Sequence, residues 1–337
     1  MSLGKRLFSE GEAPLGDYGF GIVTYSGNSS TQSITGLGFQ PDLVWIKERG
    51  SNPENHNWYD SSRGVRNFIG SNSTAANVFG STSRLTSFDS DGFTLGADNE
   101  INDNGSTYVA WCWKANGGNT ISNADGTNTS TVQASTGFSM VQGTASGGYP
   151  TANSFGHGLG VTPAMIFVKE TSGIAGWSAW HKSYTNTAQN YLNLNTNSPI
   201  ASSQYVWGNS APTSSVFSIT DGWTVNVGAT FIAYCFAEVS GYSAFGSYAG
   251  NGSSQSINIG FQPDLVILRK YDDNQDWMIW DSVRDGNPKS LRLEANNTDA
   301  EVSGTTNINF ISTGFEFTSS YYNDSGKNSI YMAFKIT

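Results

Sequence analysis

The sequence contains the same series of short apolar segments three times. The segment Phe39-Gln-Pro-Asp-Leu-Val-Trp-Ile-Lys47 returns as Val161-Thr-Pro-Ala-Met-Ile-Phe-Val-Lys169 and as Phe261-Gln-Pro-Asp-Leu-Val-Ile-Leu-Arg269. A second segment, Tyr108-Val-Ala-Trp-Cys-Trp113, returns as Phe231-Ile-Ala-Tyr-Cys-Phe236 and as Tyr331-Met-Ala-Phe334. Because the copies follow one another in the same order at nearly constant spacing, we expect the chain to fold as three related modules.

Each copy has the features of antiparallel β-structure. The segments are short, rich in β-branched and aromatic residues, and separated by clusters of Gly, Asn, Ser and Asp. Proline lacks the N–H that a strand ladder needs, so Pro41 and its counterparts mark the beginnings of strands. The run Leu43-Val-Trp-Ile46 is continuously apolar, as in a strand that is covered on both faces. No window shows a sustained helical period, so the predicted fold is all-β, with three tandem antiparallel β-sandwich or jelly-roll modules.

The repeat also sets the expected module boundaries. We expect modules at residues 20–117, 118–240 and 241–337, preceded by residues 1–19, which have no counterpart in the repeat and are expected to form an attachment arm. The join between modules one and two, from Ala115 to Ser135, is rich in Gly, Asn, Ser and Thr, whereas the join from Ala237 to Gly241 is short. We therefore expect modules two and three to pack as one block and module one to stand apart.

Charge and composition exclude several classes of protein. The 337 residues include 17 Lys and Arg against 27 Asp and Glu, a formal charge of −10. A nucleic-acid-binding protein needs a basic face, so this balance argues against one. No apolar run of about 18 residues predicts a membrane span, and the N-terminus lacks the apolar region of a signal peptide. Cys112 and Cys235 lie in matching apolar runs and are expected to be buried thiols rather than a disulfide.

The sequence points to no catalytic residue, metal ligand or cofactor. It contains no nucleophile elbow, phosphate-binding loop or zinc signature. His56, His157 and His181 fall at different places in the repeat and are expected to be surface or capping residues. Two loops at residues 98–105 and 272–276 concentrate oxygen ligands that would suit calcium, but polar β-turns are the favoured explanation for both.

An aromatic segment with polar neighbours follows the first repeated strand in each module. An indole face beside a carboxylate or amide suits a sugar, because the ring stacks on C–H groups while the polar group binds hydroxyls. The candidate glycan-binding residues are Trp58, Tyr59, Asp60, Trp177, Trp180, Trp277, Trp280 and Asp281. The alternative is that these large rings fill the sandwich cores and seal the module interfaces. A glycan-binding protein should expose the tryptophans, and a purely structural one should bury them.

With these segments in view, the chain resembles a family of tail-fibre-like repeat proteins from the virions of tailed phages of aquatic bacteria. That family's modules have the form Gly-Phe-x-Pro-Asp-Leu-Val-Trp-x-Lys, Asp-Ser-x-Arg, Asp-Gly-Phe-Thr-Leu and Tyr-Val-Ala-Trp-Cys-Trp-Lys. Module one carries all four elements, at residues 38–47, 60–63, 91–95 and 108–114. Module two has His181-Lys-Ser-Tyr184 in place of Asp-Ser-x-Arg.

The resemblance implies a structural protein on the surface of the virion, with concanavalin-like sandwich modules and no catalytic residues. It also implies a homo-trimer that docks to other virion proteins through residues 1–19. The leading expectation is a tail-associated attachment protein that binds a host surface glycan. The alternative is a capsid-decoration or tail structural protein without receptor binding. An enzyme that degrades surface polysaccharide is disfavoured, because His181 interrupts the recurrence of Asp60 and Asp281.

Overall fold

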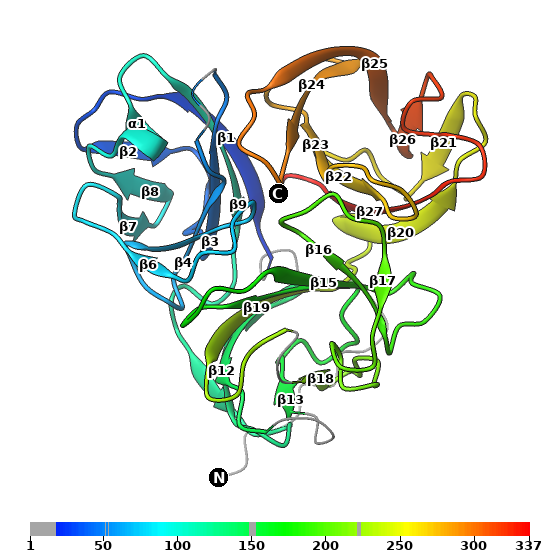
Figure 1. Cartoon of the computed structure of the whole chain (residues 1–337). Coiled ribbons are helices and arrows are strands. Elements are labelled where there is room, and N and C mark those ends of the chain that lie inside the picture. Colours follow the sequence, from blue (N-terminus) through cyan, green and yellow to red (C-terminus); the bar gives the residue numbers. More distant parts are fainter. Residues whose placement is uncertain (1–17, 51, 53, 148–152, 221–223) are drawn as a thin grey trace.

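The computed structural model of the chain describes residues 18–337 except 51, 53, 148–152 and 221–223 (Figure 1). The all-β prediction is confirmed. Every strand pair in the sheets of the described residues is antiparallel, and their one α-helix is the four-residue α1 (Asn99–Asn102). Residues 1–17, which make up most of the expected attachment arm, lie outside the described residues. None of the described helical residues forms a segment long and apolar enough to cross a membrane.

Modules one and two each consist of a large sheet with a small sheet packed on one face. In module one the large sheet has the order β1 (Phe20–Ser26), β9 (Thr107–Trp113), β3 (Leu43–Glu48), β4 (Asn57–Asp60), β5 (Asn67–Gly70) and β6 (Val78–Phe79), and the small sheet consists of β2 (Gln32–Thr35), β8 (Gly92–Leu95) and β7 (Leu85–Asp89). In module two the large sheet has the order β10 (Ile121–Asn123), β11 (Ser130–Ser135), β12 (Phe138–Thr144), β19 (Thr230–Phe236), β14 (Met165–Glu170), β15 (Trp177–His181), β16 (Asn190–Asn193) and β17 (Ala201–Ser202), and the small sheet pairs β13 (Asn153–Gly156) with β18 (Val216–Ile219).

Module three builds the same sandwich from one continuous sheet. Its order is β20 (Ser243–Ala249), β27 (Asn328–Phe334), β22 (Leu265–Lys270), β23 (Met278–Asp281), β24 (Lys289–Glu294), β25 (Val302–Ile311), β26 (Gly314–Phe317) and β21 (Gln255–Asn258). Residues from β25 and β26 pack against residues from β22 and β23 in one apolar cluster. The sheet therefore curls over so that its last strands cover its first ones.

The strand register corrects one match in the repeat. Leu43 lies opposite Trp113, and in the same way Met165 lies opposite Phe236 and Leu265 opposite Phe334. Phe334 therefore corresponds to Trp113 and Phe236, two residues away from the match that the segment Tyr331-Met-Ala-Phe334 suggested.

The corrected register explains a compensating pair in module three. Tyr331 stands where modules one and two have Ala110 and Ala233. Its strand partner is Gly246, whereas Ala110 faces Val23. The Tyr331 ring leaves no room for a Cβ at Gly246. A large and a small residue have thus exchanged places across the same strand pair, as close packing requires.

The three large sheets share one core. Alternate residues of β3, including Trp45, point into this shared core, together with Phe167 of β14 and Ile267 of β22. The opposite faces of the three sheets line three separate cores, one within each module. Figure 1 accordingly shows three lobes around a common centre. The expectation that module one stands apart is wrong, because its large sheet supplies part of the shared core.

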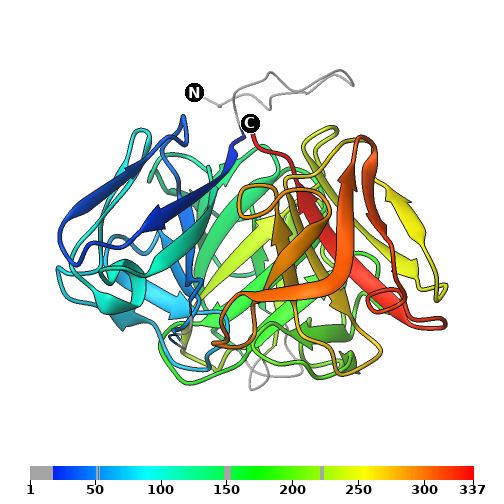
Figure 2. The same ribbon diagram turned by 90° about the horizontal axis from the view of Figure 1, so that it is seen from above.

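Both ends of the described chain lie at one end of this block (Figure 2). The backbone N–H of Phe20 donates to Thr337 Oγ1 at 3.3 Å, and the N–H of Thr337 donates to Phe20 O at 3.2 Å. Phe138 lies at the same end as Phe20, because both begin the strand that pairs with the last strand of their module. Each of these seven-residue strands runs about 20 Å to the opposite end of the block.

Candidate functional site

The eight predicted glycan-binding residues are all interior. None has more than 2% of its surface exposed. Trp58, Trp177 and Trp277 belong to the shared core, while Trp180 and Trp280 belong to the cores of their own modules. A sugar cannot stack on a ring that protein atoms cover, so the prediction for these residues is corrected to its alternative: they are core residues.

The Asp-Ser-x-Arg motif forms a buried turn in the two modules that have it. Arg63 Nε lies 2.6 Å from Asp60 Oδ2, and the N–H of Arg63 donates to Asp60 Oδ1 at 2.8 Å. Arg284 and Asp281 repeat both contacts, at 2.6 and 2.9 Å. Each guanidinium also donates to a backbone carbonyl of the strand before the turn. Arg63 Nη2 lies 3.0 Å from Trp58 O in β4, and Arg284 Nη2 lies 3.0 Å from Ile279 O in β23. The ion pair therefore fixes the direction of the chain as it leaves β4 or β23.

The serine of the motif binds a second repeated residue. Ser61 Oγ donates to Asp42 at 2.6 Å, and Ser282 Oγ donates to Asp264 at 2.7 Å. Both acceptors are the aspartate of the Pro-Asp-Leu-Val segment. Module two has Ala164 at that position and also lacks the Asp-Ser-x-Arg motif, so the two elements are absent together. Their joint absence from module two is expected, because the serine and the aspartate bind each other in the other two modules.

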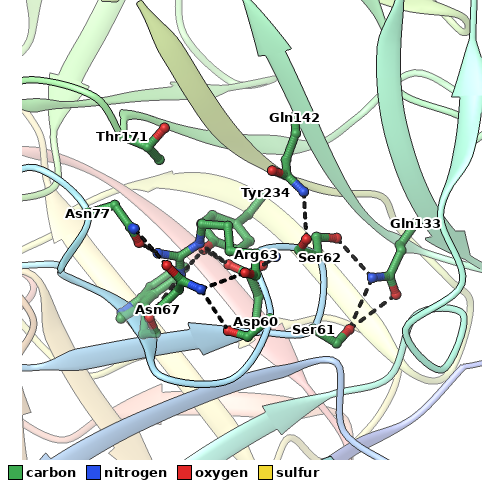
Figure 3. Close-up of polar contacts among 12 residues, drawn as sticks. Asp60, Ser61, Ser62, Arg63, Asn67, Asn77, Gln133, Gln142, Thr171 and Tyr234 are labelled. Atoms are coloured by element: carbon green, nitrogen blue, oxygen red, sulfur yellow. Dashed lines mark hydrogen bonds and ion pairs between the residues drawn. The ribbon is translucent and has the colours of Figure 1, made fainter. Parts of the chain in front are cut away.

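The same carboxylates receive hydrogen bonds across the module junctions. Tyr234 of module two donates to Asp60 Oδ2 at 2.6 Å (Figure 3). Trp111 Nε1 of module one donates to Asp281 Oδ2 at 3.0 Å. Modules one and three are thus each joined to a neighbour at the equivalent position.

His181 replaces the carboxylate in module two and makes a different contact. Burial lowers the pKa of His181 to about 3, so its ring is neutral. Nδ1 accepts from the N–H of Ser183 at 3.1 Å, which leaves the proton on Nε2, and Nε2 donates to Tyr331 O of module three at 3.3 Å. An imidazole fits here because the facing group is a carbonyl rather than a donor.

A second set of junction contacts lies one strand away. Trp177 Nε1 donates to Gly70 O at 2.8 Å, and Trp277 Nε1 donates to Asn193 O at 3.0 Å. His56 holds the corresponding position in module one, because it lies four residues before Asp60, just as Trp177 and Trp277 lie four residues before His181 and Asp281. The His56 ring lies beside the backbone carbonyl of Glu294 in module three. The sequence pattern alone does not mark His56 as the counterpart of two tryptophans.

Three repeated asparagines, which were not predicted from the sequence, support this second set. Asn72, Asn195 and Asn296 each accept the backbone N–H of the residue just described, at 3.0, 2.8 and 2.7 Å. Each stands two residues after the end of β5, β16 or β24. The only sequence signal is one asparagine at the same place in each repeat. Asparagine is so common in this chain that the match becomes visible only when the strands are aligned by their register.

The basic residue that ends each first repeat forms a third set. Lys47, Lys169 and Arg269 are fully buried. They donate to backbone carbonyls of a neighbouring module, at Thr298 (3.2 Å), Thr74 (3.3 Å) and Ser198 (2.5 Å) respectively. Burial lowers the pKa of both lysines to about 8 and that of Arg269 to about 10. The three cations therefore clamp loops of adjacent modules.

The remaining sequence candidates have ordinary structural roles. Cys112 and Cys235 are buried free thiols, as predicted. The three histidines are buried, which corrects the expectation of surface positions, although His157 and His181 do cap turns through Nδ1. Asp98 caps α1 and pairs with Arg84 at 3.1 Å, as a polar turn would. Within the described residues, no three His, Cys, Asp or Glu side chains gather as a metal site would require.

The surface of the described residues includes two hollows that could hold a ligand. The first, of about 420 Å³, lies on module two and is lined by Asn128, Thr129, Thr131, Gln142, Gly143, Thr144, Thr171, Thr230 and Phe231. The second, of about 470 Å³, lies at the end of the block that holds the termini and is lined by Tyr18, Leu37, Gly38, Phe39, Lys114, Gly241, Tyr242, Lys335, Ile336 and Thr337. The first hollow has an uncharged polar lining, and the second combines aromatic rings with two lysines.

Comparison with known proteins identifies a family but no activity. No curated protein and no solved structure matches the chain. A family described as "Domain of unknown function (DUF7483)" matches residues 15–336, so one family domain extends over all three modules. The chain therefore belongs to the DUF7483 family.

Proposed function

We propose that this chain is a structural protein of a bacteriophage particle, in which the three modules form one rigid block. The main support is that the residues of the segments resembling phage virion proteins make contacts inside the protein. Asp42, Asp60 and Arg63 bind groups of their own module, and Asp60 also binds Tyr234 of the next. Because these repeated residues stabilise each module and the junctions between modules, they suit a protein whose role is to be a stable component of the particle.

We further propose that the block is mounted by the end where its termini lie. Phe20 and Thr337 are hydrogen bonded to each other, so the described chain begins and ends at the same end of the block. The expected docking to other virion proteins would place this end against the particle and the opposite end outward. The location on the virion surface and the homo-trimer remain predictions.

Particle composition tests the proposal directly. Particles of a phage that encodes this chain should contain it by mass spectrometry and bind gold-labelled antibody raised against residues 18–337. A variant lacking residues 2–17 should fold but fail to enter particles, whereas replacing those residues with a Gly/Ser segment of equal length tests whether their sequence matters. Purified particles without the protein would refute the virion role. Normal incorporation of the truncated variant would refute only the docking arm.

Host attachment is the second candidate function. The aromatic residues no longer support it, because they are buried. One observation still favours it: the uncharged hollow includes Thr144 and Thr230, which lie at the end of the block opposite the termini. A block mounted by its terminal end would present that hollow to the outside.

A further inference from the structure

The three module junctions share one backbone contact at their outer edge. The N–H of Asn77 donates to Thr171 O at 2.9 Å, between modules one and two. The N–H of Ile200 donates to Tyr271 O at 2.6 Å, between modules two and three, and that of Glu301 donates to Arg49 O at 3.0 Å, between modules three and one. These three pairs occupy equivalent positions, so their side chains can be compared directly.

In two junctions the side chains at this position span the gap. Arg49 binds Glu301 through two nitrogens, with Nη2 at 2.7 Å, and Glu301 also binds Arg284 at 2.8 Å. Between modules two and three, Tyr271 and Ile200 pack against the shared core, and the ring of Tyr271 meets that of Tyr184 at 6.2 Å. One junction is therefore closed by charges and another by apolar packing.

The junction between modules one and two is not closed in this way. Thr171 is short and turns back to its own module, where its Oγ1 lies 2.8 Å from Thr230 Oγ1. Asn77 instead accepts from Arg63 Nη1 at 2.6 Å. The hollow of about 420 Å³ lies beside Thr171, and its volume is in the range of about 300–1,000 Å³ usual for small-molecule sites.

The floor of this junction hollow carries three threonines, with Thr144 paired to Thr230 and Thr131 paired to Gln142. Thr131, Thr144 and Thr230 lie on neighbouring strands β11, β12 and β19 and are exposed. Within the described part of the chain, the hydroxyls of Thr131 and Thr144 have no hydrogen-bond partner. On one side Gln142 donates to Ser62 O of module one at 2.8 Å, which places the edge of module one along the hollow (Figure 3).

The lining determines which ligand chemistry fits. All nine lining residues are uncharged. The nearby Arg63 is paired with Asp60, so the cation and the carboxylate balance. A charged ligand would lose hydration without gaining a counter-charge, whereas hydroxyl and amide groups both donate and accept, as sugar hydroxyls do. Threonine methyl groups add apolar contact for the C–H faces of a sugar ring.

We propose that the junction hollow binds a neutral carbohydrate on the floor formed by Thr131, Thr144 and Thr230, with Gln142 at its wall. This inference goes beyond the structural role proposed above, and it names the ligand class of the hollow that supports host attachment. Carbohydrate binding is tested on the purified protein and the structural role on particles, so either can fail without the other. The hollow's position at the end opposite the termini gives a bound glycan access from solution.

The most informative variant copies a residue pair from one junction of this chain into another. The double substitution Asn77→Glu with Thr171→Arg reproduces the Glu301 and Arg49 pair, which already closes the junction between modules three and one. Arg63 can bind the new glutamate as Arg284 binds Glu301. The variant is therefore expected to fold normally while its arginine fills the hollow. Thr35→Arg, at an exposed position on β2, adds the same side chain elsewhere and serves as the control.

The assay uses a printed array of neutral hexose and N-acetylhexosamine oligosaccharides, with sialylated and uronic-acid oligosaccharides on the same slides. The parent and Thr35→Arg should bind neutral oligosaccharides only, and Asn77→Glu/Thr171→Arg should lose at least tenfold in titrations with the best one. Thr144→Val, which keeps the side-chain shape, should weaken binding about fivefold through loss of one hydrogen bond. Absence of neutral binding at millimolar oligosaccharide, a preference for charged oligosaccharides, or unchanged binding by the double variant would overturn the proposal.

Discussion

Replacing His181 should remove a defined part of the protein's sensitivity to acid. The folded protein keeps this imidazole neutral, because burial lowers its pKa from a usual value near 6.5 to about 3. In the unfolded chain the same ring takes up a proton below pH 6.5. Between these two values protonation favours the unfolded state, so the stability that the neutral ring contributes is present at pH 7 and is lost as the pH falls.

The size of this loss follows from the two pKa values. At pH 5 the unfolded chain gains about 2 kcal/mol relative to the folded chain from protonation of His181 alone. The substitution His181→Gln keeps a side-chain acceptor for the Ser183 N–H and a donor for Tyr331 O but cannot titrate in this range. The variant should therefore show a smaller fall in unfolding free energy between pH 7 and pH 5, by about 2 kcal/mol.

Urea denaturation at pH 7 and pH 5, for the parent and for His181→Gln, measures this difference. His157→Gln is a matched comparison, because His157 has the same two contacts, to the Leu159 N–H and Thr213 O, within one module. Burial also lowers the pKa of His157, so that variant should lose acid sensitivity in the same direction. Equal pH dependence in the parent and His181→Gln would refute the reasoning about the junction imidazole.

Two further predictions concern packing and buried charge. Ala110→Leu should cost about 1–3 kcal/mol of unfolding free energy by overpacking the core of module one, and adding Val23→Gly should recover part of it, because Gly246 makes room for Tyr331 in module three; a melting temperature equal to the parent's would contradict the placement. Arg284→Leu should cost about 3–5 kcal/mol, because it leaves Asp281 buried and charged, whereas Arg49→Leu should cost about 1 kcal/mol or less at its more exposed position; equal losses by denaturant titration would show that the burial of the ion pair is unimportant.

Much of the fold is readable in the sequence because its signals are local. The prolines at 41, 163 and 263 each stand two residues before a strand, at Leu43, Met165 and Leu265. The unbroken apolar run of β3 correctly indicated a strand covered on both faces. The local sequence of β3 does not show which part of the chain covers its second face. The long join after Ala115 suggested a detached module, but the apolar face of β3 required a partner, and the other two modules supply it.

The candidate site was missed for a different physical reason. A tryptophan beside an aspartate has the same appearance in sequence whether it faces a sugar or lies in a core that satisfies its polar atoms. Only the fold shows that the carboxylate of Asp281 is satisfied by Trp111, 170 residues away, and that of Asp60 by Tyr234. The threonines of the junction hollow lie in separate strands and have no distinctive spacing, so no sequence pattern brings them together.

The chemical differences between the three junctions also determine the order of the modules around the centre. Each module presents equivalent strands and a buried cation at the equivalent position to its neighbours. Identical junctions would therefore let any module pack beside any other, including one from a second chain. Here Arg49 meets Glu301, Tyr271 meets Ile200, and Thr171 meets Asn77. Pairing Arg49 with Ile200 would leave the guanidinium without its counter-charge, and pairing Glu301 with Tyr271 would place a carboxylate against an aromatic ring. Since each wrong pairing costs free energy that the right one does not, these three edge positions favour one closed arrangement of one chain over exchange between chains.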